Sequence, residues 1–524
     1  MHETGTATRR EMMLLTASAA VLATSGRAGA MPAAAYGGPG GIAVVLPAMP
    51  GEMPLNWADR ADAFDRFIMN PANKLFRSRA DGSRYFASAL EGTGDGGLTT
   101  FAPIVLGKIL RGEPMDWLTP SLAAYYGDAH GIFLDGHEAD SCEYWYLMNV
   151  NALAAGIIRS HLAHDPAWTG RLRTSADRLI ALAHQIDYDF NDQGYRFDTR
   201  RAWTKQDIYR QPDAVGGYAY LCLLAYESFG NANYLSEARE GLRRYLSFPR
   251  NPWYEVPSGA MACLAAARLS VLDPGVDVAK ALRFVLDPGG RPLQTGTWGR
   301  SRVDGLMAGF RTEPPGEAYS MESLMTAGYL LPVVRYRPEF ASAIGRYLLS
   351  AAANMRLFYS DCIPAENQSR PELTSAVPYE RLSRTLGGKS PFAAGDYGSH
   401  RSIYGGAYAL WWGELVRPTE EPFILKLDLA RTDFFEPKKY PTFLYYNPHA
   451  DARSLTVPTP DGVRLYDLAA HRFLESHGAS AAQLAIPPMR SRIIVQVPDG
   501  TCRTVRRGRL VCNDVTVDYA LPNE

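Results

Sequence analysis

The sequence predicts a mainly α-helical protein, in which an inner ring of helices lies within an outer ring and a small antiparallel β domain follows. Two observations support this prediction. Apolar helical segments alternate with amphipathic ones through residues 55–417, and beyond Pro418 short β-branched runs are separated by Pro, Gly, Asn and Asp. The 524 residues, 46% of them hydrophobic, suffice for one large domain and a smaller one.

A targeting segment is predicted at residues 1–30, and it is set aside from the fold. Residues 8–13 (TRREMM) resemble a twin-arginine export signal, and an apolar run at 14–23 and an Ala28-Gly29-Ala30 cleavage pattern follow. The apolar run is too short for a membrane anchor. Residues 31–54, rich in Gly, Pro and Ala, are predicted to form a flexible leader. We therefore expect a periplasmic or secreted protein.

The near-neutral net charge argues against nucleic acid and anionic membranes as the main binding partners. The formal net charge is −1, and a neutral surface does not steer nucleic acid or an anionic membrane toward the protein. No later segment is long and apolar enough to span a bilayer, so no membrane span is predicted.

Each predicted inner helix is apolar on nearly every face, as in AVGGYAYLCLLAY, whereas each predicted outer helix has one polar face. The inner helices are predicted at residues 99–110, 141–162, 213–229, 258–270, 321–334 and 402–416. The outer helices are predicted at residues 57–79, 115–126, 167–185, 234–246, 276–286 and 340–358. This alternation is typical of a barrel of helices inside a second barrel.

The alternation, with loops rich in Gly, Tyr and Trp before the inner helices, resembles the (α/α)6 toroid of many glycoside hydrolases and polysaccharide lyases. The resemblance covers about residues 55–417 and includes no motif of a single family. A helical-repeat scaffold is the alternative, but the inner helices start at uneven intervals. The resemblance implies a carbohydrate as the substrate.

Residues 418–524 are predicted to form the β domain. The runs YYNPHADARSLTV, YDLAAHRF and RIIVQVPDG look like the accessory β-sandwich that often closes carbohydrate-active enzymes at the C-terminus. Such a domain would support the toroid, and sugar binding there is a lesser alternative.

The six cysteines fall into two groups. Cys142, Cys222, Cys263 and Cys362 lie among apolar neighbours without metal-ligand spacing. In TCRTVRRGRLVC, a three-residue turn at residues 506–508 would place Cys502 opposite Cys512. A disulfide between these two cysteines is therefore predicted for an oxidising compartment.

In a toroid the loops before the inner helices converge on one cavity, so the candidate site is expected there. The richest loop, residues 127–151, carries acids and histidines and leads into an aromatic helix. Flat aromatic side chains, carboxylates and guanidinium groups suit a sugar. The predicted substrate-binding residues are Tyr144, Trp145, Asn149, Asp207, Tyr209, Arg210, Trp253, Tyr254, Tyr319, Tyr397 and Arg401.

Hydrolysis of a glycosidic bond needs two carboxyl groups, and the candidates are Asp140, Glu143, Asp213, Glu317 and Glu322. The second and fifth inner helices face each other in a six-fold ring, so Asp140 and Glu143 would confront Glu317 and Glu322. A wide separation would favour an inverting mechanism. Glu143, beside three aromatic residues, is the candidate general acid. Ordinary helix capping is the alternative role for acids at helix starts.

Elimination from a uronate polymer is the alternative reaction. It needs a base and a group that neutralises the carboxylate of the substrate. His400 with Arg401, Tyr397 and Asn149 or Asn151 would supply these groups, although a structural role for His400 is also consistent with the sequence. A non-catalytic glycan-binding protein is the third alternative.

No cofactor is predicted. The acids and histidines between Asp128 and Asp140 match neither H-E-x-x-H nor an EF-hand loop, and calcium is the metal that their carboxylates would favour. The chain has no G-x-x-x-x-G-K-[ST] phosphate loop and no G-x-S-x-G elbow.

Overall fold

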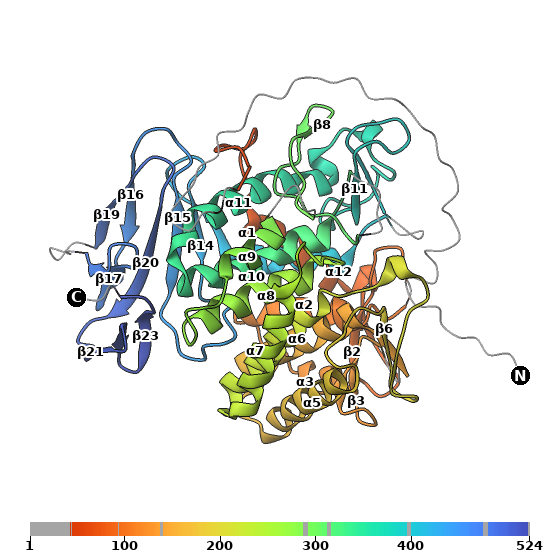
Figure 1. Ribbon diagram of the computed structural model, residues 1–524. Coiled ribbons are helices and arrows are strands. Elements are labelled where there is room, and N and C mark those ends of the chain that lie inside the picture. Colours follow the sequence, from red (N-terminus) through yellow and green to blue (C-terminus); the bar gives the residue numbers. More distant parts are fainter. Residues whose placement is uncertain are drawn as a thin grey trace, which may run out of the picture.

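The computed structural model describes residues 42, 44–92, 94–136, 140–286, 292–311, 316–395, 400–474 and 480–521. The predicted targeting segment and most of the leader lie outside these residues. The helices form one body and the C-terminal strands lie beside it (Figure 1).

An inner ring of helices closes on itself. Each of its helices packs on the next, and the last two short helices pack on the first. Nearly all of their residues are buried, as the sequence predicts. Within the described residues the ring comprises α2 (Leu98–Arg111), α4 (Tyr144–Ile157), α6 (Ala214–Phe229), α8 (Val256–Ser270), α10 (Ser320–Tyr336), and α12 (Ile403–Gly406) with α13 (Ala409–Leu415).

Outer helices cover this ring. α1 packs on α13, α5 and α7 on α6, α9 on α8, and α11 on α10. These helices are α1 (Trp57–Met69), α3 (Leu118–Ala123), α5 (Pro166–Gln185), α7 (Ala232–Ser247), α9 (Val278–Leu286) and α11 (Ala341–Asn354).

Several predicted helices differ from the structure. The segment predicted as a helix at 141–162 begins with a strand, Ser141–Glu143, and its helix starts only at Tyr144. The helix predicted at 57–79 ends at Met69, because Asn70 and Pro71 start a short 3-10 turn, and Phe76–Ser78 form strand β1. The helix predicted at 402–416 is divided into α12 and α13.

Short antiparallel strands connect the helices. Several of them lie directly before inner helices, and the longest of these sheets, β5-β6-β7 and β10-β11-β12, lead into α4 and α10. The strands are β1 (Phe76–Ser78), β2 (Arg84–Phe86), β3 (Tyr126–Gly127), β4 (Ile132–Phe133), β5 (Ser141–Glu143), β6 (Gly194–Arg196), β7 (Arg201–Trp203), β8 (Thr297–Trp298), β9 (Ser301–Arg302), β10 (Glu317–Tyr319), β11 (Arg381–Ser383) and β12 (Phe392–Ala394).

The C-terminal region contains an antiparallel sheet in the order β13-β14-β15-β20-β17-β18. α11 packs on β15 and β20, and a second core cluster joins β16 and β19 to the sheet. The layers are thus unequal, with a two-stranded ribbon over a six-stranded sheet. The strands are β13 (Val416–Pro418), β14 (Leu425–Asp428), β15 (Thr442–Tyr446), β16 (Arg453–Pro458), β17 (Val463–Asp467), β18 (Arg472–Phe473), β19 (Ala481–Ile486), β20 (Ser491–Pro498), β21 (Arg503–Arg506), β22 (Arg509–Cys512) and β23 (Val515–Asp518).

The connection from β14 to β15 fastens this region to the helices. The carboxylate of Asp433, fully buried, pairs with Arg335 of α10 and accepts a hydrogen bond from Tyr336 Oη at 2.7 Å. Arg159, beyond α4, donates to the carbonyl oxygens of Phe434 and Phe435. Both helices contribute these side chains from their C-terminal ends, so the connection covers that end of the ring.

The predicted disulfide is wrong. Cys502 and Cys512 are both free, the first exposed and the second buried. The turn between β21 and β22 has two residues, Arg507 and Gly508, both with positive φ, so Arg503 rather than Cys502 lies opposite Cys512. A change of one residue in register places the two cysteines on different faces.

Among the described residues, none of the helices has the length and apolarity that crossing a bilayer requires.

Candidate functional site

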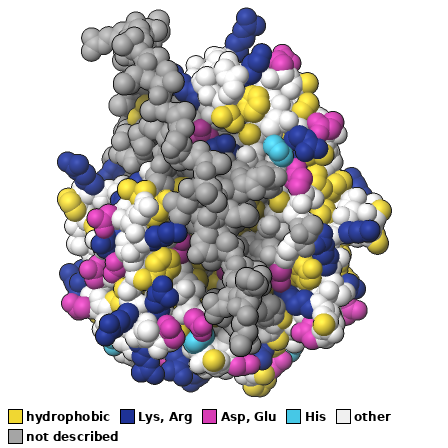
Figure 2. Space-filling view, turned by 90° about the vertical axis from the view of Figure 1, so that its right-hand side faces the viewer, with side chains coloured by type: hydrophobic (Ala, Val, Ile, Leu, Met, Phe, Trp, Pro, Cys, Tyr) yellow, Lys and Arg dark blue, Asp and Glu magenta, His cyan; other side chains and the backbone are white. Residues whose placement is uncertain are grey.

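The N-terminal ends of the inner helices lie on the side of the molecule that carries β6 and β11 (Figure 1). Figure 2 shows this side, where acidic and basic side chains are interspersed over the part that is coloured by type. Neither charge dominates there, so the visible surface would not select ligands by the sign of their charge.

Glu143 lies where β5 meets α4, and two carboxamides hold its carboxylate. Gln193 Nε2 donates to Oε1 at 2.9 Å, and Gln211 Nε2 donates to Oε2 at 2.8 Å. Both glutamines are buried, whereas Glu143 is half-buried. The carboxylate is thus fixed in orientation by two donors that complement its negative charge.

Three inner helices, α2, α4 and α8, receive hydrogen bonds at their N-terminal ends from loops that precede another inner helix. Asp135, from the loop before α4, accepts the N–H of Thr99 at the start of α2 at 2.7 Å. Gln211, before α6, accepts the N–H of Trp145 in α4 at 2.8 Å. Asp213 accepts the N–H groups of Tyr254 and Glu255, which precede α8, at 2.9 and 3.0 Å.

In contrast, the outer helices α1, α5 and α7 start with caps of their own, from Asn56, Asp165 and Asn231. Neighbour capping satisfies the exposed helix N–H groups and ties adjacent sectors of the rim together. The carboxyl group of Asp213 therefore has a structural role in addition to any chemical one.

Asp213 is 1% exposed, and burial raises its pKa to about 7, although the N–H of Glu255 and the charge of Arg311 oppose the shift. Its Oδ1 atom has no hydrogen-bond partner among the described residues. Asp213, Tyr245 and Trp253 line a small cavity of about 10 Å³. A cavity of this volume holds about one water molecule.

Other carboxylates occupy the rest of the rim. Glu322, in the first turn of α10, is buried, and so are Glu255 before α8 and Glu380 before β11. Glu380 Oε1 accepts a hydrogen bond from Tyr404 Oη at 2.6 Å. Oε2 of Glu317, on β10, lies 3.6 Å from Nε of Arg381.

The structure places several predicted aromatic residues at these helix starts, and Trp145, Trp253, Tyr254 and Tyr319 are all buried. The Nε1 donors of Trp145 and Trp253 find no partner within the described part of the chain. Buried donors of this kind are rare in proteins and are normally satisfied by water or a ligand.

Asn149 faces the ring interior. Burial raises the pKa of the Tyr408 phenol, an effect that the nearby Glu322 increases and the Asn149 side chain opposes. Residues of α4 and α10 and Tyr408, the N-cap residue of α13, therefore meet inside the ring.

Five predicted residues lie away from this cluster. Asp140 is exposed, and Asp207 pairs with Arg210 on the surface at 3.0 Å. Tyr144 is fully buried against Phe190 and belongs to the core. Tyr209 is half-buried in the same surface loop as Asp207, and the predicted residue Tyr397 lies outside the described residues.

His400 and Arg401 have different environments. Nδ1 of the half-buried His400 lies 2.7 Å from Ser369 Oγ. The guanidinium group of the fully buried Arg401 lies 3.4 Å from the ring centre of Tyr379 and donates to the carbonyl oxygen of Arg370. Arg401 is thus a structural residue beneath the rim.

The cluster that the sequence offered as a metal site is dispersed. Asp135 caps α2 and His130 stacks on Phe197 at 4.7 Å, while His137 and Glu138 lie outside the described residues. Within the described ranges, no group of three His, Cys, Asp or Glu side chains is placed to hold a metal ion.

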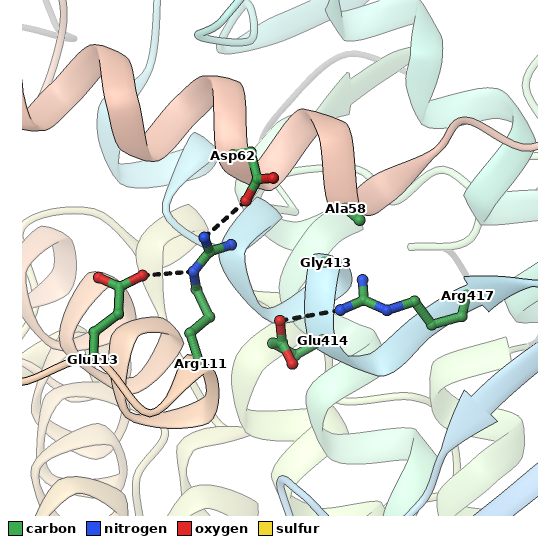
Figure 3. A pocket seen from close by; sticks show the side chains of 7 residues that line it. All are labelled: Ala58, Asp62, Arg111, Glu113, Gly413, Glu414 and Arg417. Atoms are coloured by element: carbon green, nitrogen blue, oxygen red, sulfur yellow. Dashed lines mark hydrogen bonds and ion pairs between the residues drawn. The ribbon is translucent and has the colours of Figure 1, made fainter.

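A polar pocket of about 200 Å³ lies at the other ends of the inner helices (Figure 3). Arg111, the last residue of α2, pairs there with Asp62 and Glu113, and Arg417 pairs with Glu414. Because these charges neutralise one another, we do not assign the site to this pocket.

Sequence comparison shows no relative: no protein-family model and no curated protein matches the chain. Solved structures resemble it at low identity. A sugar epimerase from a ruminal bacterium is 10% identical, covers 68% of this chain and 98% of its own, and has a TM-score of 0.46. A family 76 glycoside hydrolase from a bovine Bacteroides thetaiotaomicron strain is 10% identical, with coverage of 69% and 77% and a TM-score of 0.45.

A GH127 β-L-arabinofuranosidase from Geobacillus stearothermophilus T6 covers 89% of this chain and 86% of its own, at 9% identity and a TM-score of 0.40. All three proteins are named for reactions on sugars. These TM-scores are too low to carry an argument about activity, which therefore has to be inferred from the residues of the chain itself.

Proposed function

We propose that the protein is an exported glycoside hydrolase that cleaves a poly- or oligosaccharide at the N-terminal rim of the inner ring. The observation that carries this proposal is the position of Glu143, held by two carboxamides at the start of α4. Buried tryptophans with unpaired Nε1 donors lie on the same rim, and such side chains suit the faces and hydroxyl groups of a sugar.

The two carboxyl groups of the reaction are assigned to Glu143 and Glu322. α6 and α8 separate α4 from α10 in one direction around the ring, and α2 and the α12–α13 pair separate them in the other, so their N-terminal ends face each other. Glu322 is 4% exposed, and burial disfavours a charged carboxylate, which suits a proton donor. Glu143, with two N–H donors, suits the base that activates water. This assignment reverses the predicted role of Glu143 as the general acid, because two carboxamide donors bind its carboxylate.

The geometry favours hydrolysis over elimination. Elimination from a uronate needs a cation at the substrate carboxylate, but Arg401 is buried against Tyr379 and bound to backbone carbonyl groups. His400, although half-buried, would act without that partner.

Incubation with panels of neutral and uronate polysaccharides tests this function. We expect new reducing ends without the ultraviolet absorbance of an unsaturated product. Absorbance of that product would replace the hydrolase with a lyase. Binding without either signal would identify a non-catalytic glycan-binding protein.

Export is part of the proposal and rests on the twin-arginine-type segment. A fusion of residues 1–54 to a reporter should reach the periplasm, and replacement of Arg9 and Arg10 by Lys should retain the reporter in the cytoplasm.

A further inference from the structure

The β21–β22 hairpin concentrates positive charge on an otherwise neutral protein. Residues 503–512 include four arginines and no acid, and Arg503, Arg506 and Arg507 are exposed. Arg506 lies directly opposite Arg509 across the hairpin. Like charges in that position destabilise a strand pair, so an external anion would relieve a repulsion that the fold itself maintains.

A second observation joins this hairpin to the main sheet. The guanidinium groups of Arg503 on β21 and Arg464 on β17 lie 4.1 and 4.5 Å from the ring centre of Phe473. Two cations thus share one aromatic ring. The ring attracts each of them, but it does not remove their mutual repulsion.

The nearby carboxylates are already engaged. Asp518 accepts hydrogen bonds from Tyr466 and His471, and Asp467 pairs with Arg492 at 2.7 Å. Among the described residues, no carboxylate forms an ion pair with the arginines at positions 464, 472, 503, 506 or 507. Within the described part of the chain, these arginines can therefore pair with an external anion.

We propose that this surface binds an anionic polysaccharide through its carboxylate or sulfate groups. We define the basic surface as Arg464 and Arg503, whose guanidinium groups lie over the ring of Phe473, together with Arg472 next to Phe473 in the sequence and Arg506 and Arg507 at the tip of the hairpin. Planar guanidinium groups form bidentate hydrogen bonds with carboxylate and sulfate groups. Val505 lies between Arg503 and Arg506 in the sequence, and its side chain, 68% exposed, offers an apolar contact to a sugar ring.

The basic surface lies at the opposite end of the molecule from the candidate site, since β21 and β23 are on one side of Figure 1 and β6 and β11 on the other. It therefore serves as an anchor to the polymer rather than as a subsite. That the polymer is a glycan rests on the proposed function, whereas the anion-binding chemistry follows from the arginines alone.

Equilibrium binding of the full chain, measured by affinity electrophoresis, tests the proposal without turnover. The probes are polygalacturonate, a sulfated polysaccharide and a neutral β-glucan, each at low and high salt. We expect retardation only by the anionic polymers, and we expect salt to weaken it. Arg506→Glu with Arg507→Glu should weaken this binding at least tenfold.

Arg66→Glu with Arg239→Glu is the matched control, because these exposed residues on α1 and α7 give the same change in charge. Equal loss in both variants, or equal binding of the neutral glucan, would overturn the proposal. Tighter binding of duplex DNA or of vesicles with an anionic lipid would also overturn it. Because no turnover is measured, the result does not depend on whether the rim hydrolyses a sugar.

Discussion

Gln211 makes two hydrogen bonds at the start of α4: its Nε2 donates to Glu143 Oε2 at 2.8 Å, and its Oε1 accepts the N–H of Trp145 at 2.8 Å. The same side chain therefore orients the carboxylate and completes the first turn of α4. A substitution at Glu143 will therefore also change the hydrogen bonding of Gln211.

Glu143→Gln should abolish hydrolysis, with a loss of roughly 10² to 10⁴-fold in kcat. It should also destabilise the fold by about 1 kcal/mol, because the new amide group would face the donor of Gln193 or Gln211. Reducing-sugar release and urea unfolding measure the two effects. Asp140→Asn, at the exposed neighbouring acid, should retain full activity. Normal turnover by Glu143→Gln would remove this residue from the mechanism.

Asp213→Asn should flatten the pH dependence of stability. The pKa of about 7 in the folded protein lies above the ordinary value of 3.8 for an aspartate, so the native state binds the proton more tightly than the unfolded chain does. The wild-type free energy of unfolding should therefore fall between about pH 4 and about pH 7, by up to about 1.4 kcal/mol per pH unit. Asn accepts the same two N–H groups but does not titrate.

Urea unfolding of both proteins at several pH values in this window measures the difference. Asp165→Asn, at the cap of the outer helix α5, is the control for the loss of a carboxylate at a helix start. Parallel pH curves for wild type and Asp213→Asn would contradict the prediction.

Asp433→Ala should destabilise the protein by about 3 to 5 kcal/mol, because Arg335 would remain buried without its carboxylate partner. Thermal unfolding followed by circular dichroism measures this loss. Asp451→Ala, at an exposed pair with Arg453, should change stability by less than about 0.5 kcal/mol. Equal effects of the two substitutions would show that the connection does not hold the β region on the helices.

Cys502 should react with iodoacetamide in the native protein, whereas the buried Cys512 should react only after unfolding. Mass spectrometry of the modified peptides checks both statements. A disulfide-linked peptide containing both cysteines would refute the hairpin register, since that register places Arg503 opposite Cys512.

The sequence predicts the inner helices well because a helix buried on all sides has apolar residues on every face, as α6 and α10 do. It also identifies the rim, since Glu143 and Trp145 lie in the loop richest in polar and aromatic residues. It does not predict the partners of Glu143, because Gln193 and Gln211 belong to distant strands and loops and have no motif. The hairpin register depended on the left-handed conformation of Arg507, for which a non-glycine residue gives no sequence signal.

Neighbour capping makes the starts of α2, α4 and α8 depend on loops that precede another inner helix. Removal of the loop that contains Asp213, for example, would expose the N–H groups before α8 and withdraw Gln211 from α4. The damage would spread in both directions around the circle. We therefore expect the helical body to unfold in one concerted transition, without stable partial assemblies of its helices.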